Sequence, residues 1–113
     1  MGLLYYGTDA QPAEIPDRVL AHLKVVATTK LRRGESFTVT WRHATEAADG
    51  RTSIWMQPAI PLRFVFDDPE PEKLDPEYLH TLANAANTSS GVYIDLHGVP
   101  DPDIAHADAI AAA

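Results

Sequence analysis

The sequence contains no cysteine and no long apolar run. The absence of cysteine excludes disulfide cross-links and thiolate catalysis. The longest apolar stretches are much shorter than the roughly 20 residues that a membrane-spanning helix needs, and the N-terminal MGLLYYGTDA lacks the basic segment of a secretory signal. We therefore expect a cytoplasmic protein that does not enter a membrane.

The motifs of several common enzyme classes are also missing. There is no G-x-S-x-G nucleophile elbow, no G-x-x-x-x-G-K-[ST] loop and no G-x-G-x-x-G fingerprint. His43 and His80 have no partner at a metal-ligand spacing, and His22 is expected at the edge of the polar side of a helix. Residues 95–108 contain histidines and aspartates of the kind that bind divalent cations, but prolines interrupt them, and a solvated tail is the favoured interpretation. We expect no catalytic residue, no cofactor and no metal site, although an enzyme whose site the sequence does not reveal stays open as a third hypothesis.

The composition is that of one folded domain. The chain has 113 residues, of which 45% are hydrophobic, enough for a single core. Residues 1–66 carry eight Lys or Arg against six acids, a net charge of +2, whereas residues 67–113 carry one Lys against ten acids, a net charge of −9. We expect a domain at residues 1–96 and a flexible, acidic and alanine-rich tail at residues 97–113.

Periodicity predicts a hairpin followed by a helix in the first third of the chain. Residues 3–15 contain two short apolar segments around the turn sequence GTDAQP. From Pro16 a helical stripe begins, formed by Val19, Leu20, Leu23, Val26, Ala27 and Leu31. Asp17 is predicted to cap this helix, and Gly34 is predicted to end it in the left-handed conformation.

The remainder of the chain predicts three strands, a second helix and a last strand. The strands are expected at residues 36–42, 51–57 and 62–66, with a turn at Asp49-Gly50, and their short connections imply an antiparallel meander. Asp75-Pro76 begins the second helix, whose buried stripe is expected at Leu79, Leu82, Ala83 and Ala86. The sequence therefore predicts an α+β single domain, a small antiparallel sheet of three to five strands with two helices packed on one face.

Strand alternation separates a core face from a second, more polar face. If Phe37, Val39, Trp41, Ile54, Met56, Leu62, Phe64 and Phe66 face the helices, the opposite face presents Arg42, Arg51, Trp55 and Arg63 with small hydroxyl residues between them. Such a face could bind a protein partner, or it could stack bases and contact phosphates. Alternatively, the N-terminal hairpin or the acidic segment after Phe66 covers part of Trp55.

The basic triplet in KLRRGESF has two interpretations. Lys30, Arg32 and Arg33 lie in the last turn of the predicted helix, where the helix dipole favours cations, and a glycine follows. This is typical of a helix C-terminus. The alternative is a functional basic patch at Arg32 and Arg33.

At DRVLAHLKVV, KLRRGESF, GRTSIWMQPAIPLRF and NTSSG the chain resembles a family of small uncharacterised actinobacterial proteins. The resemblance covers roughly residues 1–94 and leaves out the tail. Some members are labelled ATP-dependent DNA ligase. The residues do not support that activity, because a ligase site resembles K-x-D-G and the single Asp-Gly here follows EAA. The resemblance implies at most an accessory role near DNA.

Two functional hypotheses follow for the Arg/Trp face. The favoured one is a non-catalytic interaction module that self-associates or binds a protein partner through this face. The alternative is a nucleic-acid-associated accessory domain. The binding residues expected in either case are Arg42, Arg51, Trp55 and Arg63, with Arg32 and Arg33 as further candidates.

Overall fold

The structure is a computed structural model that describes residues 2–8, 11–43 and 50–96. The predicted turn around Asp49 and the predicted tail at residues 97–113 lie outside the described residues. The elements, in chain order, are β1 (Gly2–Tyr6), β2 (Ala13–Ile15), α1 (Asp17–Arg32), β3 (Phe37–Arg42), β4 (Arg51–Met56), β5 (Leu62–Val65), α2 (Pro76–Ala86) and β6 (Val92–Asp95). The α+β class is confirmed.

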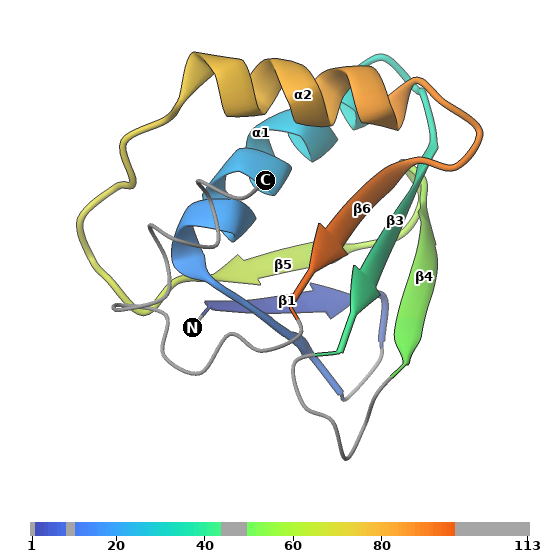
Figure 1. The fold of residues 1–113 in the computed structure, drawn as a ribbon. Helices are drawn as coiled ribbons and strands as arrows, with labels where there is room; N and C mark the ends of the chain where they lie inside the picture. The colour runs from blue at the N-terminus through green and yellow to red at the C-terminus, as the bar shows by residue number, and fades with distance from the viewer. Residues whose placement is uncertain (1, 9–10, 44–49, 97–113) are drawn as a thin grey trace.

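The strands form two sheets of three strands each. The first sheet has the order β2-β1-β5 and is antiparallel throughout, and the second has the order β4-β3-β6. In the second sheet β3 is antiparallel to β4 and parallel to β6. Figure 1 shows the strands of the first sheet running across the view and those of the second running down it. A parallel pair needs a crossover connection, and α2 lies in the one between β3 and β6.

The predicted meander of three consecutive strands is wrong in its last step. After β4 the chain does not return along the same sheet; β5 pairs with β1 instead, with Phe64 opposite Leu4 and Arg63 opposite Tyr5. The connection contains Pro58 and Pro61, which lack the N–H groups that a ladder needs. The chain therefore leaves the second sheet at this point and completes the first.

The predicted C-terminal end of helix α1 is confirmed, but its predicted N-terminal cap is wrong. Pro16 occupies the N-cap position, no side chain caps the helix, and Asp17 lies in the first turn. At the other end Gly34 has a φ of 74°, and Glu35 N–H donates to Lys30 O across the turn. Glycine adopts this conformation without the steric cost that a Cβ brings, so the sequence signal for the helix end was reliable.

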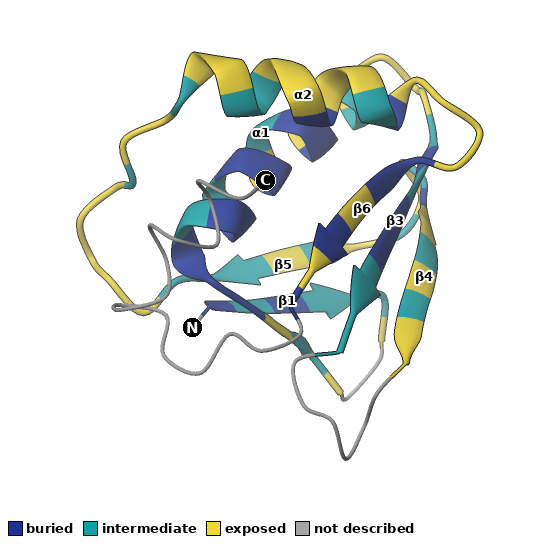
Figure 2. Ribbon diagram, in the orientation of Figure 1, coloured by how far each residue is buried: buried dark blue, intermediate teal, exposed yellow. Residues whose placement is uncertain are grey.

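The core lies between the helices and the inner faces of the two sheets (Figure 2). Helix α1 contacts β1 and α2, while α2 also contacts β3 and β6. The buried apolar residues are Leu4, Ile15, Val19, Leu20, Leu23, Val26, Ala27, Phe37, Val39, Met56, Leu82, Ala86, Val92, Ile94 and Leu96. The predicted core face of the strands is confirmed, since Phe37, Val39 and Met56 are buried and Phe64 packs against the cluster.

Helix α2 begins as predicted, but its buried stripe differs in one position. Asp75 is the N-cap, and its Oδ1 accepts hydrogen bonds from the N–H groups of Glu77 (3.0 Å) and Tyr78 (3.5 Å). Ala83 was expected in the core and is exposed, whereas Tyr78 and Ala85 pack against the core. The helix is rotated so that the large Tyr78 ring meets α1.

Candidate functional site: the outer face of the second sheet

The face of the second sheet that points away from the core carries side chains from all three strands. We call it the outer face. Its described residues are Thr38, Thr40 and Arg42 on β3, Arg51, Ser53 and Trp55 on β4, and Tyr93 and Asp95 on β6. Alternation fixes this set, because successive side chains of a strand point to opposite faces. Along β4 the odd-numbered positions are exposed and the even-numbered ones are not (Figure 2).

Two large aromatic side chains on this face are more than half exposed. Trp55 is 56% exposed and Tyr93 is 54% exposed. Trp55 lies opposite Thr38 and Tyr93 lies opposite Thr40, on the two strands that flank β3. Strand geometry separates their Cα atoms by about 12 Å, two strands across and two residues along. The two rings therefore border a shallow floor of small side chains.

The floor between the rings is held by hydroxyl groups. Thr40 is buried, and its Oγ1 lies 2.6 Å from Oγ of Ser53 on the neighbouring strand. This bond links β3 and β4 across the centre of the face. A polar floor between two exposed rings offers stacking surface on its sides and hydrogen-bonding groups in its middle.

The arginine end of the face is less basic than the sequence predicts. Arg42 lies opposite Arg51 on one side and opposite Asp95 on the other. One oxygen of Asp95 is 3.8 Å from Arg42 Nη1, so an acid partly offsets the pair of arginines. Arg51 is exposed at the start of β4. The face therefore combines aromatic, hydroxyl and mixed-charge groups.

Three of the predicted binding residues lie elsewhere. Arg63 is on β5 in the first sheet, with its guanidinium 5.1 Å from the centre of the Tyr5 ring. Arg32 ends α1 and Arg33 is its C-cap, so both belong to the helix terminus. The structure thus brings together Arg42, Arg51 and Trp55 but leaves Arg63, Arg32 and Arg33 on other elements.

Local contacts at the end of α1 also involve the first residue of the basic triplet. Lys30 Nζ donates a hydrogen bond to Glu35 Oε1 at 3.0 Å and a second one to Asn87 at the end of α2. The hydrogen bond from Lys30, and then its charge, lower the pKa of Glu35. Lys30 therefore joins the ends of the two helices.

Tyr93 and Asp95 are the residues of the face that sequence reasoning missed. The alternation in VYIDL predicted a strand but did not indicate the strand with which it pairs. The parallel pairing of β6 with β3 is formed through a crossover, and no local turn specifies it. The sequence signal for these residues was a strand pattern with a tyrosine on its polar side. That pattern does not say which strand β6 pairs with.

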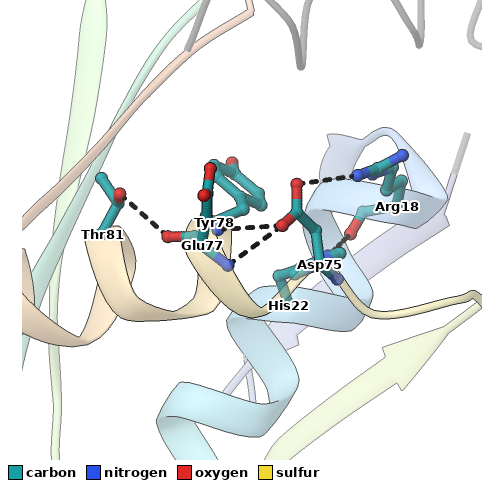
Figure 3. A network of polar contacts seen from close by, with 6 residues as sticks. All are labelled: Arg18, His22, Asp75, Glu77, Tyr78 and Thr81. Carbon is teal, nitrogen blue, oxygen red and sulfur yellow. Dashed lines mark hydrogen bonds and ion pairs between the residues drawn. The ribbon is translucent and has the colours of Figure 1, made fainter.

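A second polar constellation lies at the start of α1, where it holds the acidic segment 67–75. We call this segment the strap. Asp17 Oδ2 accepts hydrogen bonds from the N–H groups of Asp67 (3.0 Å) and Asp68 (3.1 Å) at one end of the strap. At the other end Asp75 N–H donates to His22 Nε2 (2.8 Å), and Arg18 forms an ion pair with Asp75 at 3.3 Å (Figure 3). The first turns of α1 fix both ends of the strap.

The predicted boundary position of His22 is wrong, because this residue is fully buried. Its Nε2 accepts from Asp75, so its Nδ1 carries the proton and donates to Arg18 O at 2.6 Å. The Tyr78 ring stands edge-on to the imidazole with the ring centres 4.9 Å apart. Burial raises the pKa of the Tyr78 hydroxyl. Both nitrogens of His22 are engaged, so its role is structural.

Between α1 and the strap lies an open cavity of about 540 Å³. Val25, Phe66 and Leu74 give it an apolar floor, and Lys24 and Glu72 are among its polar residues. Lys24 Nζ lies 5.8 Å from the centre of the Phe66 ring. Within residues 2–8, 11–43 and 50–96, no group of three His, Asp or Glu side chains is placed to hold a metal ion.

The arrangement of helices and strands and the exposed face together define the structural class of the protein. This is a small α+β domain with two crossed sheets, one of which exposes an aromatic face. The chain belongs to the family described as Domain of unknown function (DUF7882), which matches residues 1–97. No curated protein and no solved structure matches it significantly.

Proposed function

We propose that this protein is a non-catalytic interaction module that associates with a protein, either another molecule or a copy of itself, through the outer face of the second sheet. The observation that carries the proposal is the pair of exposed rings, Trp55 and Tyr93, on one strand-supported surface. Tryptophan and tyrosine are enriched among the residues that dominate binding energy, because they bury much surface at little entropic cost.

The exposed rings of Trp55 and Tyr93 contribute little to the stability of the folded chain, and this leaves their apolar area for a partner. A side chain that remains more than half exposed contributes little to the core, and exposed apolar groups that share one face mark a candidate interaction site. Covering both rings would remove apolar area from water and stabilise a complex by roughly 25 cal/mol per Å² before the costs of association. The hydroxyl floor and the Arg42–Asp95 pair would form the polar part of such an interface.

Nucleic-acid binding is the second candidate, and the same rings favour it. Some nucleic-acid-binding sheets stack bases on aromatic side chains of one open face. Against it stand Asp95, which offsets Arg42 on this face, and the chain's net charge of −7, which repels a polyanion. The accessory role near DNA, which the resemblance to ligase-labelled proteins implies, belongs to this second candidate.

The test compares Trp55→Ala and Tyr93→Ala with Leu74→Ala. Leu74 is 41% exposed on the strap, so its truncation controls for the loss of an exposed apolar side chain away from the face. Self-association is measured by sedimentation velocity, and bound proteins are compared by pull-down with wild type and each variant. We expect Trp55→Ala to weaken association at least tenfold, Tyr93→Ala to weaken the capture of a partner that covers both rings, and Leu74→Ala to leave both unchanged.

Fluorescence anisotropy with single- and double-stranded oligonucleotides separates the two candidates. The protein-binding proposal predicts negligible oligonucleotide binding at any salt concentration. Micromolar binding that falls steeply with salt and is lost in Trp55→Ala, by a protein that stays monomeric, would replace the proposal with the second candidate.

A further inference from the structure

The backbone of β4 directs a row of polar groups away from its neighbour β3. His43 N–H donates to Gly50 O at 2.8 Å, one position beyond the pair Arg42 and Arg51. Opposed residues of an antiparallel ladder alternate between pairs that exchange hydrogen bonds and pairs that do not. The pairs that contain Arg51, Ser53 and Trp55 are therefore of the second kind. The N–H and C=O groups of these residues point out of the sheet.

A side-chain contact supports this assignment. The Tyr6 hydroxyl, which comes from the first sheet, donates to the carbonyl oxygen of Trp55. That carbonyl must therefore be accessible from outside the β3–β4 ladder. Among the described residues, this is the one hydrogen bond that the structure records at the outward backbone groups of Arg51, Ser53 and Trp55.

β4 is thus an edge strand whose pairing groups are largely unused. It has six residues and ends the order β4-β3-β6, and in Figure 1 no labelled helix or strand lies beyond it. Proteins commonly protect such edges with proline, bulges, lysine or very short strands, because an open edge is a template for another strand. Within Arg51–Met56 the only charged residue is Arg51, and there is no proline.

The side chains of this strand are complementary to a second copy of it. In an antiparallel pair of two β4 strands centred on Ser53, each Arg51 lies directly opposite the Trp55 of the other copy. Both side chains lie on the outer face, where opposed Cα atoms in a hydrogen-bonded pair are about 5.5 Å apart. An arginine over an indole is a favourable cation–π pair, and the twofold axis forms it twice.

Neighbouring registers lack this match. Centring the pair on Thr52 brings the two Arg51 side chains onto diagonal positions, which is repulsive, and it moves Trp55 from a position opposite Arg51 to a diagonal one. Centring it on Ile54 opposes Arg51 to Gln57 and likewise makes the Arg51–Trp55 contact diagonal instead of direct. The Ser53 register needs the carbonyl of Trp55 as an acceptor, and a carbonyl has two lone pairs, of which Tyr6 uses one.

We infer that the chain forms a homodimer by antiparallel pairing of β4 with β4 of a second copy, with Ser53 on the twofold axis and Arg51 stacked on Trp55 across the interface. This inference rests on the proposed function and specifies its partner. The product is one continuous sheet of six strands, twice the three of the second sheet. Its outer face carries two Trp55 and two Tyr93 rings.

The absence of cysteine gives a direct test by disulfide trapping. Ser53→Cys introduces the only thiol of the chain at the proposed axis, where a separation of about 5.5 Å lies within the range that a disulfide bridges. Thr38→Cys is the control. It lies on the same face one strand further in and opposite Trp55, so its two copies would be about 20 Å apart, three strands across and four residues along, too far for a disulfide. Under mild oxidation we expect a cross-linked dimer from Ser53→Cys and none from Thr38→Cys.

A second pair of variants tests the edge without cross-linking. Proline at position 53 removes an N–H that points outward, so the β3–β4 ladder keeps its hydrogen bonds. Ser53→Pro is expected to raise the dimer dissociation constant at least tenfold, and Ser53→Thr is expected to leave it within threefold. Circular dichroism establishes that both variants are folded. If Ser53→Pro does not fold, Arg51→Ala and Trp55→Ala replace it in a double-mutant cycle, where a coupling close to zero contradicts the inference.

The outcomes separate this inference from the function on which it rests. A wild type that stays monomeric but binds another protein through Trp55 overturns the homodimer and keeps the interaction module. A dimer that requires Trp55 but yields no Ser53→Cys disulfide and tolerates Ser53→Pro also overturns edge pairing. A dimer that resists Trp55→Ala and is lost in Ser53→Pro supports pairing of the β4 edges but overturns the stacking of Arg51 on Trp55, and it contradicts the role given to the exposed rings.

Discussion

The start of α1 and the outer face of the second sheet use their polar and aromatic residues in opposite ways. At the start of α1, His22 is fully buried and the ring of Tyr78 packs on it. The backbone N–H groups of Asp67, Asp68 and Asp75 find their acceptors on Asp17 and His22. On the outer face Trp55 and Tyr93 are more than half exposed. The first region stabilises the fold, and the second has surface left for a partner.

The difference shows why exposure separates structural from binding residues better than residue type does. Histidine and tyrosine are residue types that often serve in catalysis, yet here His22 and Tyr78 are buried and hold the strap. Tryptophan is a residue type common in cores, yet here Trp55 is exposed, as strand alternation predicted. Truncating a buried, bonded group leaves its partner unsatisfied, whereas truncating an exposed ring costs the folded state little.

The largest effect is expected from Gly91, which lets β6 begin beside β3. Its φ is 75°, and a Cβ added there would lie 2.2 Å from the carbonyl oxygen of Thr38. Gly91→Ala should lower the free energy of unfolding by about 2–5 kcal/mol, because backbone strain and a clash with backbone add together. Gly34→Ala is the matched control. It has a similar φ of 74° with no atom within 4 Å, so it should cost about 1–2 kcal/mol.

Urea unfolding of both glycine variants measures the difference. Equal losses for Gly91→Ala and Gly34→Ala would show that β6 can move away from β3. Tyr93 would then no longer have a fixed place on the outer face.

A smaller loss is expected from His22→Phe. The ring can still pack against Tyr78, but Asp75 N–H loses its acceptor inside the protein. An unsatisfied buried donor costs about 1–3 kcal/mol. His80→Phe, at an exposed position of α2, is the control and should change stability by no more than about 0.5 kcal/mol. Thermal and urea unfolding compare the two, and equal effects would contradict the structural role of His22.

Alkaline pH should weaken the packing of Tyr78 on α1. Burial is the main cause that raises the pKa of this hydroxyl above its usual value of 10.0, so the folded state favours the neutral form. The stability that this preference contributes is present below about pH 10 and is lost as pH rises through the higher pKa of the folded protein. Wild type should therefore lose stability above pH 10 more steeply than Tyr78→Phe. Parallel slopes in a series of urea titrations would show that the ring is solvated.

The smallest effect is expected from removing residues 97–113. The predicted tail is polar, interrupted by prolines and outside the periodic pattern, and the family match ends at residue 97. The shortened chain should unfold within a few degrees of the full one, as a loss under about 1 kcal/mol implies. A much larger drop in melting temperature would show that these residues pack on the domain.

Local signals predicted most of the elements. Asp75-Pro76 specified the start of α2, Gly34 specified the end of α1, and alternation placed Val39 inside and Trp55 outside. Each of these features depends on neighbours in sequence, where steric and capping preferences act directly. The α+β class followed from the order of these elements.

Long-range pairing could not be predicted in the same way. The choice of β5 for β1, and of β6 for β3, depends on tertiary packing, and several strand partners would satisfy the same alternation. For this reason Arg63 was expected on the wrong sheet and Tyr93 was not connected with Trp55. The burial of His22 was missed because its acceptor role depends on the strap, which lies 53 residues further along.

The central claim is that the outer face of the second sheet is a binding surface, and sedimentation velocity tests it most directly. Wild type, Leu74→Ala and the double variant Trp55→Ala/Tyr93→Ala are compared from micromolar to millimolar concentration. The double variant is first shown to be folded. We expect concentration-dependent association of wild type and Leu74→Ala and a folded monomer for the double variant. Association that is equal in all three proteins would contradict the claim.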